Sequence, residues 1–223
     1  MSYGTNASSG LNAVRTITNA TWNGGTTPYL INSGYNQNIW KNDPVFMATT
    51  AVNSSGTGYI ASSYDRNGNN YNNYSILGVS AGCEYIVPSA LVPVDNANPG
   101  RPVWLAGTAT VGGVPAVINL IVDPNLIYDC QTTGDTGVGA TQNNVGNFAT
   151  IAFSASGGLV QGNSQLGTSS VTVNLTGITP TAGNFPVFIN GLSNYPNNVS
   201  GQIYNNVEVI IAHHYFRTMT SVA

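Results

Sequence analysis

The sequence predicts an all-β protein: an antiparallel barrel or sandwich with an extended N-terminal arm. Three observations lead to this fold class. Short apolar or alternating runs recur between clusters of turn residues, no window sustains a helical period, and Val, Ile and Thr dominate the apolar stretches. Many short strands at a spacing of roughly 8–12 residues are typical of sandwiches and barrels.

Ten runs are predicted strands because each is apolar or alternating and is bounded by Gly, Pro or Asn. Ser170–Gly177 (SVTVNLTG) alternates strictly, which predicts one face toward solvent. Ala116–Val122 is apolar on both faces except at Asn119, which predicts a central strand. The predicted strands, in chain order, are Ala13–Thr18, Pro44–Thr50, Gly58–Ser62, Ile76–Val87 (two strands, or one with a bulge at Gly82), Pro102–Val111, Pro115–Asp123, Asn147–Phe153, Ser170–Gly177, Phe185–Ile189 and Asn205–Phe216.

The segments between the predicted strands contain residue pairs that predict turns. Gly112-Gly113 predicts a hairpin, and Asn23-Gly24, Asn67-Gly68 and Asn190-Gly191 suit turns that need positive φ. The linkers 88–102 and 132–147 are long for a compact domain, and such loops are often functional. Residues 1–12 are small and polar, so we expect 1–27 to form an arm and the first strand, and 28–223 to form one domain.

The chain of 223 residues has only 6% charged side chains and a net charge of −3, whereas ordinary domains carry about 25%. Its 30 Asn and 26 Gly imply a surface of neutral amides and hydroxyls. Five scattered cations argue against direct nucleic-acid binding, and no apolar run reaches the ~18 residues of a membrane span. The N-terminus lacks the pattern of a signal peptide, so we expect synthesis in a cytoplasm.

Two cysteines, Cys83 and Cys130, lie in apolar, strand-like stretches. We expect buried free thiols, although a single bridge between them stays open at this point.

Several sequence patterns partly match catalytic or metal sites. Gly78–Gly82 (GVSAG) matches a nucleophile elbow at Ser80, but the following CEYIVP is strand-like rather than helical. His213 and His214 are neighbours on a predicted strand and so point to opposite faces. Asp65–Asn69 fails the calcium-loop pattern, and nothing brings Asp123 and Asp129 together as a glycosidase pair. We therefore expect no enzyme, no catalytic residue, no cofactor and no metal.

The segment Tyr64–Tyr74 (YDRNGNNYNNY) combines tyrosines with side-chain amides, which suits a contact surface for glycan or protein. This segment is the basis of an alternative function, an adhesin-type module of a tail or head fibre that contacts host glycans.

Pro28–Val45 (PYLINSGYNQNIWKNDPV) resembles the opening of a group of small β-rich virion proteins of tailed bacteriophages. Those proteins begin with a "Y-x-I-x-S-G-Y" run that leads to "I-[FWY]-K-x-D-P-V". Asn42 departs from the pattern, since the family tends to have Gly there. Further similar runs follow in the same order: Ile76–Tyr85 (ILGVSAGCEY), Val122–Gln131 (VDPNLIYDCQ), Val145–Ala149 (VGNFA) and Asn205–His214 (NNVEVIIAHH).

The resemblance implies a capsid decoration, or cement, protein that binds the outside of a phage head and bridges shell subunits. It implies the major capsid protein as partner, a homo-oligomer (dimer or trimer), and a place on the capsid exterior after synthesis in the bacterial cytoplasm. It implies structural turns at Gly34-Tyr35 and Asp43-Pro44 and no catalytic residue.

Overall fold

The computed structural model describes residues 8–31, 38–52, 58–62, 75–84, 103–104, 117–133, 137–153, 167–181 and 185–218. Within these ranges the chain is built of strands, and its only helical segment is one 3-10 turn, η3 (Gln142–Asn144). The predicted all-β class is therefore confirmed. No helix in the described ranges is long and apolar enough to cross a membrane.

Six strands form the first sheet, and every neighbouring pair in it is antiparallel. Thr132, just after the second of these strands, makes a parallel bridge to Val173 on the far edge strand. The N–H of Thr133 donates to the Val173 carbonyl at 2.8 Å. The sheet therefore curls and brings its last strand beside the end of its second strand. In sheet order the strands are β1 (Asn12–Thr16), β9 (Leu126–Gln131), β13 (Asn206–Ile211), β12 (Val187–Leu192), β10 (Phe148–Phe153) and β11 (Val171–Thr179).

Seven strands form the second sheet. Most of its pairs are antiparallel, while β2–β5 and β14–β6 are parallel. Because β6 pairs with both β4 and β8, the pairings β6–β4–β5–β2–β8–β6 form a cycle. In sheet order the strands are β15 (Arg217–Thr218), β14 (His213–His214), β6 (Ile76–Glu84), β4 (Pro44–Val52), β5 (Gly58–Ser62), β2 (Thr27–Ile31) and β8 (Val117–Ile121); β3 (Ile39–Trp40) and β7 (Val103–Trp104) form a separate ribbon.

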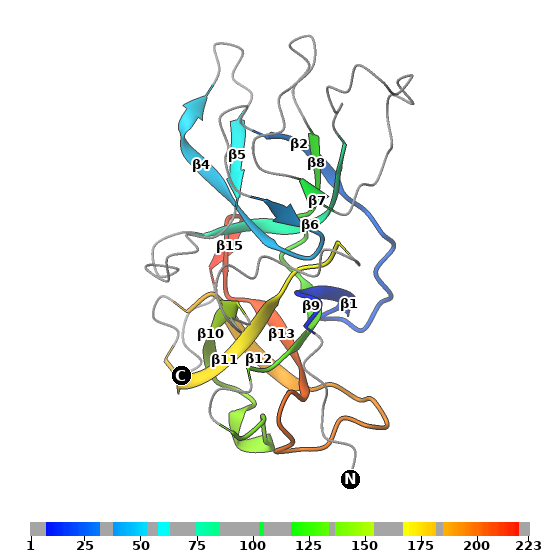
Figure 1. The fold of residues 1–223 in the computed structure, drawn as a ribbon, viewed down its shortest axis with the longest axis vertical. Coiled ribbons are helices and arrows are strands. Elements are labelled where there is room, and N and C mark those ends of the chain that lie inside the picture. Colours follow the sequence, from blue (N-terminus) through cyan, green and yellow to red (C-terminus); the bar gives the residue numbers. More distant parts are fainter. Residues whose placement is uncertain are drawn as a thin grey trace.

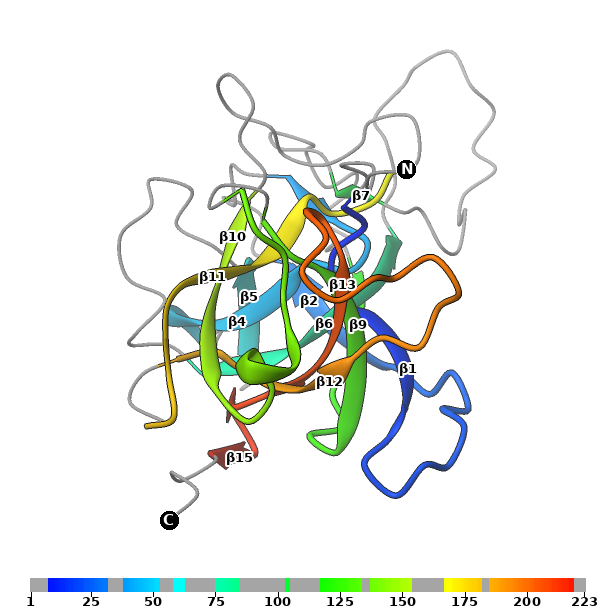
Figure 2. The same cartoon turned by 90° about the horizontal axis from the view of Figure 1, so that it is seen from below.

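The two sheets lie one above the other along the long axis, and they share a core (Figure 1). Phe46 and Val79 of the second sheet belong to the same apolar cluster as Tyr128 of the first. Val45, the neighbour of Phe46, faces a separate cluster within the second sheet, because successive strand residues point to opposite faces. Seen along the long axis, the strands of the first sheet surround a common centre (Figure 2).

The turn between β3 and β4, residues 40–43, connects segments that are distant in sequence. The Asn42 carbonyl accepts the N–H of Leu11 at 3.0 Å, and the Asn42 N–H donates to the Ser80 carbonyl at 2.7 Å. The N–H of Ser169 donates to the carbonyl of residue 41 at 2.8 Å. Main-chain groups of one turn therefore join the N-terminal segment, the second sheet and the start of β11.

Asn42 adopts a left-handed backbone with φ of +68°. Glycine reaches this region without strain and asparagine tolerates it, which explains how Asn fits at this position. Its side chain adds contacts that Gly lacks, since Nδ2 donates to the Ser9 carbonyl at 2.9 Å and to Asn12 Oδ1 at 2.8 Å. Gly10 lies so close that a Cβ there would sit 2.5 Å from the Asn42 carbonyl oxygen.

Several sequence predictions change in detail. Leu11 is fully buried in the core, so the end of the predicted arm belongs to the packed body; residues 1–7 lie outside the described ranges. β6 is one strand with a register shift beside Gly82, as one of the two alternatives predicted. The prediction that one face of β11 points toward solvent is wrong at Thr172. This residue is buried, and its hydroxyl donates to the Ala152 carbonyl at 3.1 Å.

Two further differences concern strands and turns. β2 was not predicted as a strand, although it pairs with both β5 and β8. Asn190-Gly191, expected at a turn, lies inside β12 at an irregularity in its pairing with β13. The expected central place of β8 is confirmed, because β8 pairs with β2 and β6. Gly112-Gly113 lies outside the described residues.

Candidate functional site

Two connections meet at the lower end of the first sheet in Figure 1 and form what we call the loop platform, residues 137–145 and 193–205. The N–H of Gly201 donates to the Ala140 carbonyl at 2.8 Å, and the N–H of Gly139 donates to the Gly201 carbonyl at 3.3 Å. A Cβ on Gly139 would sit 1.7 Å from the Gln202 carbonyl oxygen. The two loops are thus in close backbone contact, and glycine is required at residue 139.

Asn205 joins the two loops through one buried side chain, which is only 3% exposed. Its Oδ1 accepts the Ala140 N–H at 2.8 Å and the Thr132 hydroxyl at 3.1 Å. Its Nδ2 donates to the carbonyls of Ala140 at 2.7 Å and Val199 at 3.3 Å. A single amide therefore satisfies four polar groups of three segments, which fixes the loops in one arrangement.

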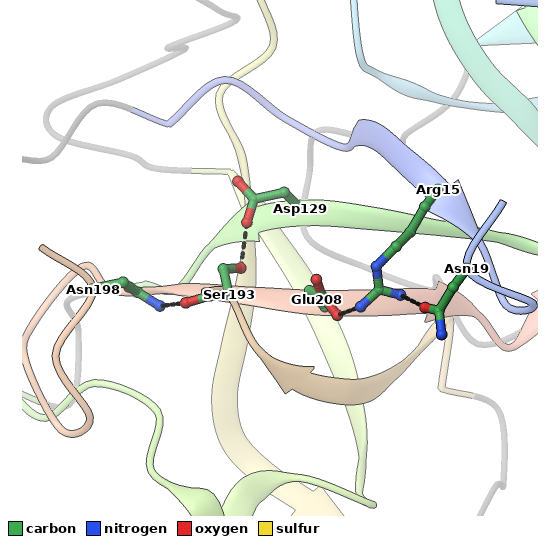
Figure 3. Close-up of polar contacts among 6 residues, drawn as sticks. All are labelled: Arg15, Asn19, Asp129, Ser193, Asn198 and Glu208. Atoms are coloured by element: carbon green, nitrogen blue, oxygen red, sulfur yellow. Dashed lines mark hydrogen bonds and ion pairs between the residues drawn. The ribbon is translucent and has the colours of Figure 1, made fainter. Parts of the chain in front are cut away.

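Asn198 closes the second loop onto β13. Its Nδ2 donates to the carbonyls of Ser193 at 2.7 Å and Asn206 at 2.8 Å, and its Oδ1 accepts the Asn206 N–H at 2.6 Å. The Ser193 hydroxyl donates to Asp129 on β9 (Figure 3). Asp129 also accepts Asn206 Nδ2 at 2.7 Å, so this carboxylate anchors the platform to the sheet.

Burial is the main cause that raises the pKa of Asp129 above its ordinary value. The hydrogen bonds from Ser193 and Asn206 act in the opposite direction, while the nearby charge of Glu208 raises the pKa further. Glu208 lies directly opposite Asp129 in the β9–β13 ladder, where like charges repel. Arg15 on β1 offsets this repulsion by pairing with Glu208, and its Nη1 donates to Asn19 Oδ1 at 3.0 Å (Figure 3).

The outer surface of the platform is uncharged, because residues 137–145 and 193–205 contain no Asp, Glu, Lys, Arg or His. Three large apolar side chains on it face solvent: Val138 is 54% exposed, Tyr195 51% and Val199 59%. A fixed neutral surface with exposed apolar groups has a low desolvation cost when it is covered by another protein.

Ser80 does not have the surroundings of a catalytic nucleophile. Ser80 is buried within β6, and its N–H donates to the Asp43 carbonyl at 2.8 Å. It does not stand on a strand-to-helix turn, which a nucleophile elbow requires. In the part of the chain that the structure describes, no three His, Cys, Asp or Glu residues gather as metal ligands.

The two histidines alternate as predicted, with His214 buried and His213 partly exposed. Nδ1 of His214 accepts the Phe216 N–H at 3.2 Å. Burial first, and the nearby charge of Arg217 second, lower the pKa of His214 to about 4, while Asp123 acts in the opposite direction. His214 is therefore neutral near pH 7.

Both cysteines are buried free thiols, as expected. Burial raises the pKa of Cys130 far above its ordinary value, which makes this thiol unreactive. Asp123 lies in the β8–β9 turn, where its Oδ1 accepts the Asn125 N–H at 2.8 Å. Asp65 and the segment Tyr64–Tyr74 lie outside the described residues, as does Gly34-Tyr35.

The loop platform could be predicted only in part from the sequence. The linker 132–147 stood out by its length, but Asn198 and Asn205 are two of 30 asparagines, and nothing local distinguishes them. No family model, no curated protein and no solved structure was found to match this chain.

Proposed function

We propose that this protein is a virion structural protein that decorates the outside of a phage head and bridges its shell subunits. The proposal joins the ordered sequence resemblance to one structural observation, the loop platform. The described part of the chain offers a contact surface that is uncharged, partly apolar and fixed by buried amides.

The rigidity of the platform matters because a cement protein must add interface free energy to a shell. Loops that order only on binding spend part of that energy on conformational entropy. Here Asn198 and Asn205 already hold the loops, so little ordering is left to do. The exposed Val138, Tyr195 and Val199 supply apolar area at the centre of the contact.

The proposed partner is the major capsid protein, and the proposed form is a homo-oligomer, a dimer or trimer that matches a local symmetry axis of the shell. A stable contact of this type buries about 1,200–2,000 Å² in total. An oligomer that places one platform on each neighbouring subunit clamps subunits that would otherwise separate under internal pressure.

The test is co-sedimentation of the purified protein with heads that lack it, comparing wild type with Val199→Asp. A buried carboxylate without a partner opposes association, so we expect binding to weaken by about tenfold or more, equivalent to about 1.4 kcal/mol. The matched control is Ile17→Asp, which adds the same charge at an apolar side chain that is 45% exposed between β1 and β2. The control should bind like the wild type.

Equal binding by both variants would remove the platform from the proposal. No binding of the wild type to any head, together with its absence from the virion, would overturn the proposed function. A cryo-electron reconstruction of the virion decides the location: density on the outer shell supports decoration, while density on tail or head fibres supports the adhesin alternative.

A further inference from the structure

Asn-Gly pairs can undergo a spontaneous reaction that converts the asparagine to aspartate or isoaspartate. The main-chain nitrogen of the glycine can attack Cγ of the asparagine, so that a five-membered succinimide forms and the side-chain nitrogen leaves as ammonia. Water then opens the ring at either carbonyl to give aspartate or isoaspartate. Glycine favours the reaction because it has no Cβ to hinder the attack. The described residues contain two such pairs, Asn23-Gly24 and Asn190-Gly191.

Asn23-Gly24 lies in an exposed connection between the bridge at Thr21 and the start of β2. The N–H of Gly25 donates to Asn23 Oδ1 at 3.0 Å. This hydrogen bond draws electron density from Cγ and is placed to stabilise the negative charge that develops on Oδ1 during attack. Gly24 has a φ of +80°, and a Cβ there would meet nothing within 4 Å, so the glycine lies in open surroundings.

Asn190-Gly191 has the same two residues but a different backbone. Both flanking positions are held in the β12–β13 ladder, with Ile189 opposite Val209 and Gly191 opposite Glu208. Asn190 is the extra residue at the register shift between these two pairs, and the pairing on both sides limits the movement that would bring the Gly191 nitrogen to Cγ. Ring closure at Asn190 therefore needs local opening of a paired strand, although its side chain is exposed.

We propose that Asn23 is a site of spontaneous succinimide formation, which converts it to aspartate and isoaspartate, and that the strand protects Asn190 from the same reaction. Water is the only co-reactant, and no bound group is needed. Each event adds one negative charge to a chain whose net charge is −3 and inserts an extra main-chain carbon when isoaspartate forms. The proposal is independent of the proposed function.

The test follows both sites in the full chain during incubation at mildly alkaline pH. Chymotryptic peptides separate them, because Trp22 and Tyr29 bracket the first pair and Phe188 precedes the second. Mass spectrometry in heavy-oxygen water scores each conversion, and fragmentation assigns isoaspartate. We expect conversion at Asn23 in the folded protein to be at least about tenfold faster than at Asn190, a ratio that corresponds to about 1.4 kcal/mol in the barrier.

The unfolded chain in urea is the internal control, since both pairs then lack structure and should react at similar rates. Asn23→Gln should abolish the signal at that position without changing the rate at Asn190, because a six-membered ring closes far more slowly. Equal rates at the two sites in the folded protein would overturn the proposal. So would an Asn23 that reacts in urea but stays intact when folded.

Discussion

The β3–β4 turn and the loop platform both bury polar groups, but they satisfy them by different means. At the turn, the hydrogen bonds run mainly between main-chain groups, and the key requirement is the left-handed backbone of Asn42. On the platform, the side-chain amides of Asn198 and Asn205 add to the main-chain bonds and link separate segments. The first arrangement depends on backbone conformation and should accept any residue that reaches that φ. The second depends on the amide itself and should accept few replacements.

The largest effect is expected from Asn205→Ala. The change removes all four side-chain hydrogen bonds of Asn205 and leaves the buried N–H of Ala140 without a partner. The Ala140 carbonyl keeps the Gly201 N–H, and the Thr132 hydroxyl keeps the main-chain carbonyl of residue 205. At about 1 kcal/mol for each of the four hydrogen bonds lost, we expect the free energy of unfolding to fall by about 4 kcal/mol. Urea unfolding measures the loss.

Asn143→Ala is the matched control for that measurement. Asn143 lies on the same platform but is exposed, so the change should alter the free energy of unfolding by less than about 0.5 kcal/mol. If the two variants unfold alike, the amide of Asn205 is not what holds the platform.

A slightly smaller effect is expected at the turn, where two substitutions of Asn42 separate backbone from side chain. Asn42→Val loses two side-chain hydrogen bonds and forces a β-branched residue to a φ of +68°, which should cost about 3 kcal/mol. Asn42→Gly loses the same bonds but keeps the backbone, so it should cost about 1 kcal/mol. Thermal or urea unfolding of the pair gives the difference, and equal losses would show that the side chain, not the backbone, dominates here.

His214 combines the two kinds of hydrogen bonding, since its side-chain ring accepts a main-chain N–H. Its pKa falls from 6.5 to about 4 on folding, so the unfolded chain binds more protons between these values. Stability linked to His214 is therefore fully present above pH 6.5 and is lost as the pH falls toward 4. Two charged groups act on His214: Arg217 opposes its protonation, and Asp123 favours it.

Urea unfolding at a series of pH values should show this slope in the wild type and a reduced slope in His214→Phe. An unchanged slope in the variant would assign the acid sensitivity to other groups.

The smallest effect is expected at Asp129, whose pKa is raised on folding. A raised carboxyl pKa means that stability is fully present below the pKa of the unfolded chain and is lost as the pH rises through the folded pKa. Asp129→Asn cannot ionise, so its stability relative to the wild type should improve as the pH rises through this window. Unfolding curves at matched pH values test the trend, and a relative stability that does not change with pH would contradict it.

The sequence predicted the fold class and most strands because alternation and turn residues are local signals. It missed β2, where Pro28 interrupts the pattern of a short strand. It misplaced Asn190-Gly191 because pairing with β13 overrides the turn preference of that dipeptide. The platform could not be predicted as a unit, since its central contact joins Asn205 to Ala140, which lie 65 residues apart in the chain. Only the length of the linker 132–147 pointed toward it.

The order in which the strands enter the sheets has a consequence for how the chain folds during and after its synthesis. Among the described strands β1 pairs with β9, yet the strands of the second sheet from β2 to β8 lie between them in the chain. On a ribosome the first strand therefore emerges long before its partner, and β14 arrives last to join β6. Such distant pairings slow folding to about milliseconds or seconds. During that interval the sparse charge of the chain gives little protection against aggregation, so we expect correct folding to depend on conditions that keep nascent chains apart.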